Sequence, residues 1–407
     1  MKYEIKNIAG IDCIFAPMNE WNSITIDIWV KAGSAYETKE EAWISHVLEH
    51  MFFKGWKKRK TPKEVATAMD KIGAIFNAWT GEHTTNYFVK SAPQFAEYWL
   101  EVLADMLMDA QFAEWEFQRE KGVIIQELKM YEDSPISVVW NKWQTYFLWD
   151  NSYWRPTIWF EENIRNFTRD DLFNYKKTFY AKDNLIITIA WKILDQAALE
   201  KNIEKLFKDL PEKCSRKKPE FKRNLPKNHK DFFKKDTEQN HIIISMKGLN
   251  NFDDRRYAAS LLCSMLWWNM SSRLFQEIRE KLWICYYISA GHWGCNEYWI
   301  FSVRAWLDKT KFEFWVKKIN EVIDNFLDKW FTDEEFSNAK NCIKWGIQMG
   351  IESSDEMAWY LWNQYIMKNE IHTLDEVLEK YEALKKEDII ELFPMLKEEN
   401  RYRFHIE

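Results

Sequence analysis

The chain lacks several features that would assign it to other classes of protein. No uninterrupted apolar run approaches the roughly 20 residues that a membrane-spanning helix needs. The first six residues lack the apolar stretch and small-residue cleavage site of a secretory signal. A net charge of -6 gives no electrostatic reason to expect a nucleic-acid partner. The sequence therefore predicts a protein that binds neither membrane nor nucleic acid.

Paired cysteines are also missing. The six cysteines include no Cys-x-x-Cys pair, which argues against a disulfide framework and against a thiolate zinc site. They are Cys13, Cys214, Cys263, Cys285, Cys295 and Cys342. Reduced thiols fit best, and we expect a cytoplasmic protein.

Glycine is unusually scarce, at 11 of 407 residues, against an average of roughly 7%. Tryptophan, in contrast, occurs 24 times. The two residue types together number 35, which is close to an ordinary glycine share. The deficit of one therefore matches the excess of the other.

One stretch, from Trp43 to Gly55, brings His46, Glu49 and His50 within little more than one helical turn. In a helix, residues four apart share a face, so both imidazoles would point the same way with Glu49 beside them. Zinc binds neutral imidazoles and keeps a position open for water in catalytic sites, and a carboxylate that does not bind the metal can take a proton from that water. The order H-x-x-E-H is a known catalytic motif. A single histidine is more often an ordinary core or surface residue, so a third ligand decides between the two interpretations.

A helix predicted over about 114–132 carries two acidic residues that are seven apart and therefore lie on nearly one face, Glu120 and Glu127. The same helix offers apolar side chains to a core. Spacing alone leaves two interpretations open: a functional carboxylate pair, or unremarkable surface charges.

The order of predicted elements suggests an α+β protein built from two copies of one unit. Residues 22–31 predict a strand, and residues 74–79 and 84–90 predict a hairpin. The second half repeats strand, helices, hairpin and helices, but lacks H-x-x-E-H. We expect a catalytic domain over 1–211, a basic linker over 212–235, and a homologous domain without a metal site over 236–407.

With these motifs, nearly the whole chain resembles the M16 family of zinc peptidases, which includes the mitochondrial processing peptidase. In that family the third ligand is a glutamate a little under eighty residues after the second histidine; Glu127 is 77 residues after His50. The resemblance implies that Glu127 completes the zinc site and that Glu120 is an outer carboxylate that orients the ligands. It also implies two α+β units, each a mostly antiparallel sheet covered by helices.

Other segments resemble substrate-binding parts of the family. The segment around Asn77 and Ala78 resembles an edge strand whose backbone pairs with an extended peptide. Arg279 and Tyr286 match an R-x-x-x-x-x-x-Y element, which implies that Arg279 holds the substrate and Tyr286 donates a hydrogen bond to the oxyanion. Without the resemblance, Arg279 would read as a solvated helix residue and Tyr286 as ordinary strand core.

The resemblance implies a zinc-dependent endopeptidase for extended peptides, with one Zn2+ per chain. Glu49 would act as the general base, and His46, His50 and Glu127 would bind the metal. Glu120, Tyr286 and Arg279 would complete the catalytic site in the roles given above. Half of the family's four-unit clamshell implies a dimer: a homodimer, or a heterodimer with a degenerate paralogue. The alternative function is a non-catalytic scaffold subunit. The sequence does not identify the peptide that is cleaved.

The chain departs from the family where the family commonly has glycine. Tryptophan stands at eight such positions: Trp43, Trp154, Trp159, Trp191, Trp267, Trp268, Trp283 and Trp306. Where such a position needs positive φ, tryptophan would cost on the order of 1 to 3 kcal/mol. One interpretation is a tryptophan-rich core. The other is that UGA codons, which some bacterial lineages read as glycine, encode these positions.

Overall fold

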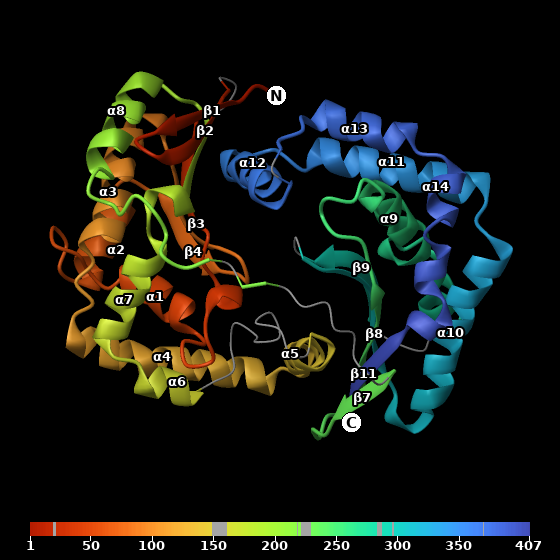
Figure 1. The fold of residues 1–407 in the computed structure, drawn as a ribbon. Helices are drawn as coiled ribbons and strands as arrows, with labels where there is room; N and C mark the ends of the chain where they lie inside the picture. Colours follow the sequence, from red (N-terminus) through yellow and green to blue (C-terminus); the bar gives the residue numbers. More distant parts are fainter. Residues whose placement is uncertain are drawn as a thin grey trace. The chain divides into compact units, whose positions relative to one another are not determined.

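The computed structural model describes residues 1–18, 22–148, 161–217, 219–220, 229–282, 287–294, 297–368 and 370–407. The chain forms two compact units, each assembled from several segments (Figure 1). Unit 1 comprises Met1–Met130, Asn151–Phe221 and Ile351–Asn363. Unit 2 comprises Tyr131–Asp150, Lys222–Gly350 and Gln364–Glu407. Residues 131–150 thus belong with the second unit, and 351–363 with the first.

Unit 1 is built on a six-stranded sheet in the order β1-β2-β6-β3-β5-β4. Its pairs are antiparallel except for β2 with β6. β3 and β6 are buried along their whole length, including their polar residues Thr25, Asp27 and Thr188, whereas β4 lies at one edge of the sheet. The strands are β1 (Glu4–Ile8), β2 (Ile11–Pro17), β3 (Ile24–Val30), β4 (Ile75–Thr80), β5 (Thr85–Ser91) and β6 (Leu185–Trp191).

Helices cover this sheet and enclose one core (Figure 1). They are α1 (Ile44–Phe52), α2 (Pro62–Asp70), α3 (Ala96–Asp109), α4 (Glu114–Asp133), α6 (Glu161–Asn166), α7 (Arg169–Phe179) and α8 (Gln196–Leu206). Helix α2 begins with a reciprocal capping box, formed by Thr61 just before the helix and Glu64 in its first turn.

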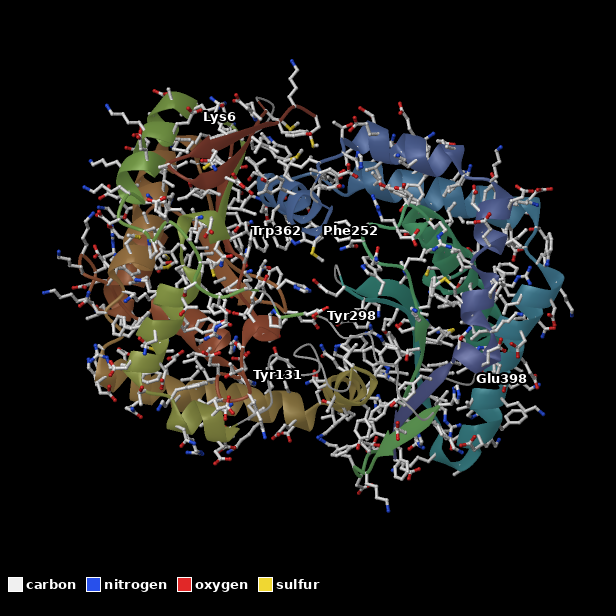
Figure 2. All side chains as sticks on the ribbon, in the orientation of Figure 1. Lys6, Tyr131, Phe252, Tyr298, Trp362 and Glu398 are labelled. Carbon is white, nitrogen blue, oxygen red and sulfur yellow. The ribbon has the colours of Figure 1, made fainter. Side chains whose placement is uncertain are left out.

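The beginning of α12 (Ser354–Lys368) also packs on the strands of unit 1. The Ser354 and Thr25 hydroxyls lie 2.8 Å apart, and the ring of Trp362 stacks on that of Trp29 with centroids 3.4 Å apart. Figure 2 labels Trp362 on this helix. A segment far along the sequence therefore completes unit 1.

Unit 2 has a five-stranded sheet in the order β7-β11-β8-β10-β9 and its own apolar core. The strands are β7 (Lys230–Phe233), β8 (Asn240–Lys247), β9 (Ile288–Gly294), β10 (Trp299–Leu307) and β11 (Tyr402–Ile406). The helices are α5 (Pro135–Phe147), α9 (Arg256–Cys263), the π-helices η5 (Ser264–Trp268) and η6 (Phe275–Glu280), α10 (Phe312–Lys329), α11 (Asp333–Met349), α13 (Leu374–Ala383) and α14 (Lys386–Ile390). Short 3-10 helices occur in both units. In unit 1 they span Ser34–Tyr36, Pro93–Phe95 and Lys182–Asn184, and in unit 2 they span Lys309–Lys311, Phe393–Leu396 and Glu398–Asn400.

The α+β class with two sheet-and-helix units is confirmed. Among the described residues, no helix is both long enough and apolar enough to cross a membrane.

Tryptophan occupies unusual backbone conformations in both units. Positive φ occurs at Trp43 (89°), Trp191 (91°) and Trp330 (62°). Trp43 and Trp191 are two of the eight positions where the family commonly has glycine, and Trp330 is a further tryptophan with positive φ. Trp267 and Trp306, in a helix and a strand, do not show positive φ. Trp154, Trp159, Trp283 and the side chain of Trp268 lie outside the described residues.

Candidate metal centre

The motif helix α1 is fixed at its N-terminus by a buried carboxylate. Glu37 accepts hydrogen bonds from the backbone N–H groups of Trp43 (2.8 Å) and Ser45 (2.9 Å), which have no partner within the helix. The Ser45 hydroxyl lies 2.8 Å from that of Tyr175 on α7. The helix that carries the two histidines therefore has a defined start. Sequence reasoning missed Glu37, although an acidic residue shortly before a helix is a recognisable capping signal.

Helix α4 brings a third side chain to this helix. Oε2 of Glu127 lies 3.4 Å from Nε2 of His46 and 3.5 Å from Nε2 of His50. The ligand atoms of the three residues all lie within 4.8 Å of one another. The structure thus brings together the three residues that the sequence proposed as metal ligands.

Behind His50 lies the second acidic residue of α4. Oε1 of Glu120 is 2.9 Å from Nδ1 of His50, which leaves Nε2 directed toward Glu127. Nζ of Lys54 lies 2.7 Å from the other oxygen of Glu120. Glu120 is 2% exposed, so its charge is balanced inside the protein rather than by water. Lys54 was also missed; it lies just beyond the end of α1, in the turn that follows Phe52.

Burial and the neighbouring charges change the pKa values of this cluster. Burial alone lowers the pKa of His46, but the Glu127 and Glu49 carboxylates outweigh it and raise that pKa to about 9. For His50, burial is likewise outweighed by Glu120 and Glu127, so its pKa is raised.

The carboxyl groups shift in the opposite direction. The imidazoles of His46 and His50 hold the pKa of the Glu127 carboxyl well below its usual range. For Glu120, burial acts to raise the pKa, but His50 and Lys54 outweigh it and lower the pKa. Both carboxylates are therefore ionised at neutral pH, and protons compete with a metal ion for the imidazoles.

Glu49 is positioned from the sheet side. The hydroxyl of Thr80 donates a hydrogen bond to Oε2 of Glu49 at 2.5 Å, and Nδ1 of His46 lies 3.6 Å from the same oxygen. Glu49 is 8% exposed. The carboxylate thus lies beside the ligand cluster without being one of its three members.

The edge strand β4 runs past this cluster. Among the described residues it pairs only with β5, so one edge of its backbone is available to a further strand. Ala78 is buried, whereas the side chain of Asn77 is exposed and accepts a hydrogen bond from the Ala78 N–H at 2.9 Å.

Arg279 and Tyr286, the two residues of the second half that were predicted to contact the substrate, are not among the residues of this cluster. Arg279 is in η6 of unit 2, where its guanidinium lies over the ring of Phe275, 4.8 Å from the centroid. Tyr286 lies outside the described residues. Their roles stay predictions.

The cluster fits a zinc ion. Nε2 of His46 is buried and has no hydrogen-bond partner among the described residues, as expected of an atom reserved for a ligand. Two imidazole nitrogens and one carboxylate oxygen form a donor set that zinc uses in hydrolytic sites. Among the described residues, this is the single group of three histidine, cysteine or acidic side chains close enough together to hold a metal ion.

The two-unit α+β fold and the cluster of His46, His50 and Glu127 define a metallopeptidase-like protein. Comparison with known proteins gives the family. The protein-family model described as Insulinase (Peptidase family M16) matches residues 18–157. The family model described as Peptidase M16 inactive domain matches residues 166–342. The chain belongs to the M16 peptidase family.

Its relatives agree with this assignment. The chain is 31% identical over 370 residues to the uncharacterized zinc protease YmxG of Bacillus subtilis, covering 90% of this chain and 88% of that protein. It is 29% identical over 391 residues to an uncharacterized zinc protease of Rickettsia felis, covering 95% and 92%. In fold it is similar to the crystal structure of a protease from Helicobacter pylori, with a TM-score of 0.90, 22% identity and coverage of 100% and 99%.

Proposed function

We propose that this protein is a zinc-dependent endopeptidase that cleaves extended peptides. One observation carries the proposal: the ligand atoms of His46, His50 and Glu127 converge within 4.8 Å, although Glu127 is remote from the histidines in sequence. Relatives that are named zinc proteases support the choice of metal.

Each residue of the cluster has a proposed role. His46, His50 and Glu127 hold the metal, and Glu120 orients His50 through Nδ1. Zinc, when bound, acts as a Lewis acid toward the scissile carbonyl and makes water more acidic. Glu49 accepts a proton from the attacking water and passes it to the leaving amine. By resemblance to the family, Tyr286 donates a hydrogen bond to the oxyanion and Arg279 holds the substrate.

The free edge of β4 supports the choice of an extended peptide as substrate. A peptide added as a strand beside Asn77 and Ala78 would be held through its main chain, which tolerates many sequences. Glu49 would then lie at the end of this strand, because Thr80 is the last residue of β4.

The setting of the protein is also proposed. In the described part of the chain four cysteines are free thiols: Cys13, Cys214, Cys263 and Cys342. Free thiols are typical of proteins in the reducing cytoplasm, where we expect this protein to act. We expect two chains to enclose the substrate as a homodimer, or as a heterodimer with a degenerate paralogue.

Substitution of the proposed base tests the function. Glu49→Gln should leave zinc content unchanged, because Glu49 is not one of the three ligands, and should lower cleavage of a quenched fluorescent peptide by roughly 10²–10⁴-fold. Glu40→Gln, an exposed glutamate ahead of the same helix, should cleave like the wild type. Undiminished cleavage by Glu49→Gln would refute this mechanism. A zinc-loaded wild type that cleaves no peptide would favour the scaffold alternative.

A further inference from the structure

We propose that Thr80 is a positioning residue for the base Glu49, an inference that rests on the proposed function. Its hydroxyl donates to Oε2 of Glu49 at 2.5 Å. This contact occupies one carboxylate oxygen and leaves Oε1 to take a proton. A hydrogen bond to an ionised group is among the stronger ones in proteins, so it can fix the rotamer of a side chain.

The backbone that carries Thr80 is itself held in place. Just after Thr80, the Gly81 carbonyl accepts a hydrogen bond from the Ser34 N–H (3.1 Å). The Glu82 carbonyl accepts one from the Ala35 N–H (2.9 Å). Gly33 permits this approach, since a Cβ at that position would lie 2.2 Å from the Gly81 carbonyl oxygen. The hairpin tip therefore has little freedom to move away from Glu49.

The location of Thr80 gives this contact a functional meaning. Thr80 ends β4, the strand whose free edge would receive the peptide. One strand thus presents backbone groups to the substrate and a hydroxyl to the base. Binding of the peptide and orientation of the base are then set by the same rigid element.

Kinetics of Thr80 variants test this inference. Thr80→Val removes the hydroxyl at nearly constant volume and should lower kcat roughly 10-fold to 100-fold with little change in KM, because the side chain faces Glu49 rather than the peptide. Thr80→Ser keeps the hydroxyl and should restore kcat. In the Glu49→Gln background, Thr80→Val should have no further effect on residual cleavage.

The outcomes separate the two proposals. An active wild type with equal kcat in Thr80→Val and Thr80→Ser would overturn the positioning role alone. So would a Thr80→Val loss that persists in full without Glu49. Zinc content and circular dichroism identify a Thr80→Val variant that is merely misfolded, and Thr80→Ala then takes its place. A zinc-loaded wild type without cleavage would overturn the proposed function, and this role with it.

A second, independent observation is the backbone at three tryptophans. From it we infer that the polypeptide made in its native cell carries glycine at positions 43, 191 and 330. Trp330 is the clearest case: it follows α10 with φ 62° and ψ -173°, a region that is essentially restricted to glycine. Its side chain is 52% exposed, so no core packing holds it in this conformation. Glycine is the usual residue at such a helix end.

Trp43 and Trp191 carry two costs each. Both have φ near 90°, and both are almost fully buried. In each, the indole Nε1 is buried and has no hydrogen-bond partner within the described part of the chain. Positive φ in a bulky residue and an unpaired buried donor are each rare in native proteins.

Backbone geometry and composition lead to the same explanation. Of five described non-glycine residues with positive φ, three are tryptophan, although tryptophan makes up 24 of 407 residues. A tryptophan-rich core would not select for positive φ. Reading of UGA codons as glycine in the native cell explains both the excess of tryptophan and its positions. Trp330 was found from its backbone alone, so it adds support that does not depend on the family comparison.

Matched substitutions and one mass measurement test this inference. Trp330→Gly should raise the unfolding temperature by about 2–4 °C, whereas Trp330→Ala should gain less, because its Cβ still opposes positive φ. Trp345→Gly is the control: this tryptophan is equally exposed but lies inside α11, where glycine should lower the unfolding temperature. Mass spectrometry of the native protein should show glycine in the peptide that spans position 330. Tryptophan in that peptide, or no gain from Trp330→Gly, would overturn the inference.

Discussion

The buried acidic residues of α4, Glu116 and Glu120, differ in what they touch. Glu116 pairs with Arg119 on its own helix at 2.5 Å. Glu120 instead contacts His50 on α1 and Lys54 in the turn just after that helix. Both are almost fully buried, so burial alone does not indicate which one serves the metal site.

This contrast gives a prediction for metal affinity. Glu120→Gln should weaken zinc binding roughly 10-fold to 100-fold, because the imidazole of His50 loses the carboxylate that orients it. Glu116→Gln, on the same helix and equally buried, should bind zinc like the wild type. Competition against a chromophoric chelator measures both. Equal affinity for the two variants would show that Glu120 does not support the site.

A second residue-scale prediction concerns pH. His292 on β9 lies between the rings of Trp299 and Phe301 and accepts a hydrogen bond from the Leu249 N–H at 3.4 Å. Burial lowers its pKa to about 3. Below the unfolded value of about 6.5, the unfolded chain binds a proton that the folded chain does not, so stability should fall from about pH 6.5 toward pH 3.

The size of this effect can be isolated by substitution. Between pH 7.5 and 5.5, His292 should account for about 1 kcal/mol of the lost unfolding free energy. His292→Gln keeps an acceptor for Leu249 but cannot take up this proton, so its stability should fall less over the same range. Urea unfolding at both pH values measures the difference. Burial also lowers the pKa of His241 and His405, and the variant keeps their share. Identical losses in the two proteins would contradict the assignment.

At the scale of elements, the contact between the loop after β3 and the β4–β5 hairpin sets the position of the edge strand. Gly33→Ala would place a Cβ 2.2 Å from a backbone oxygen that cannot easily move, so we expect a loss of about 1–3 kcal/mol in unfolding free energy. Gly346→Ala inside α11 has open space and should instead gain about 0.5–1 kcal/mol. Chemical denaturation compares them. A Gly33→Ala variant as stable as the wild type would show that the loop yields.

Elements with strong local signals could be predicted from the sequence. The motif helix, the capped helix α2 and the β4–β5 hairpin follow from periodicity, capping and turn residues. Sequence reasoning gave no strand for β1, β2, β7 or β11 and no helix for α5 or α13. These elements are short or carry mixed patterns, and tertiary pairing decides them.

The site was predictable for the same reason, up to a limit. Histidines four apart are a local pattern, whereas the position of Glu127 beside them depends on how α4 packs against α1, and only the family resemblance indicated it. The contacts of Lys54 and Thr80 lie between elements, so no spacing in the sequence reveals them. Glu37, in contrast, comes shortly before the helix that it caps and could have been recognised.

At the scale of the whole molecule, the two units have separate apolar cores. All three proposed zinc ligands belong to unit 1. A ligand that binds only the folded state stabilises what it binds, by about 2.7 kcal/mol at a concentration 100 times its Kd. This stabilisation should therefore act on unit 1, and on unit 2 only as far as the two units unfold together.

Hydrogen exchange can locate this effect. Zinc added to chelator-treated protein should slow amide exchange in α1 and in the part of α4 around Glu127 by up to about 100-fold, because these amides exchange through openings that release the metal. Exchange in β8 and β10 should change little. In Glu127→Gln, which lacks the ligand carboxylate, the same zinc concentration should protect α1 far less. Equal slowing in α1 and in β8 and β10 would mean that the two units open as one cooperative body. Protection that survives Glu127→Gln would place the zinc elsewhere.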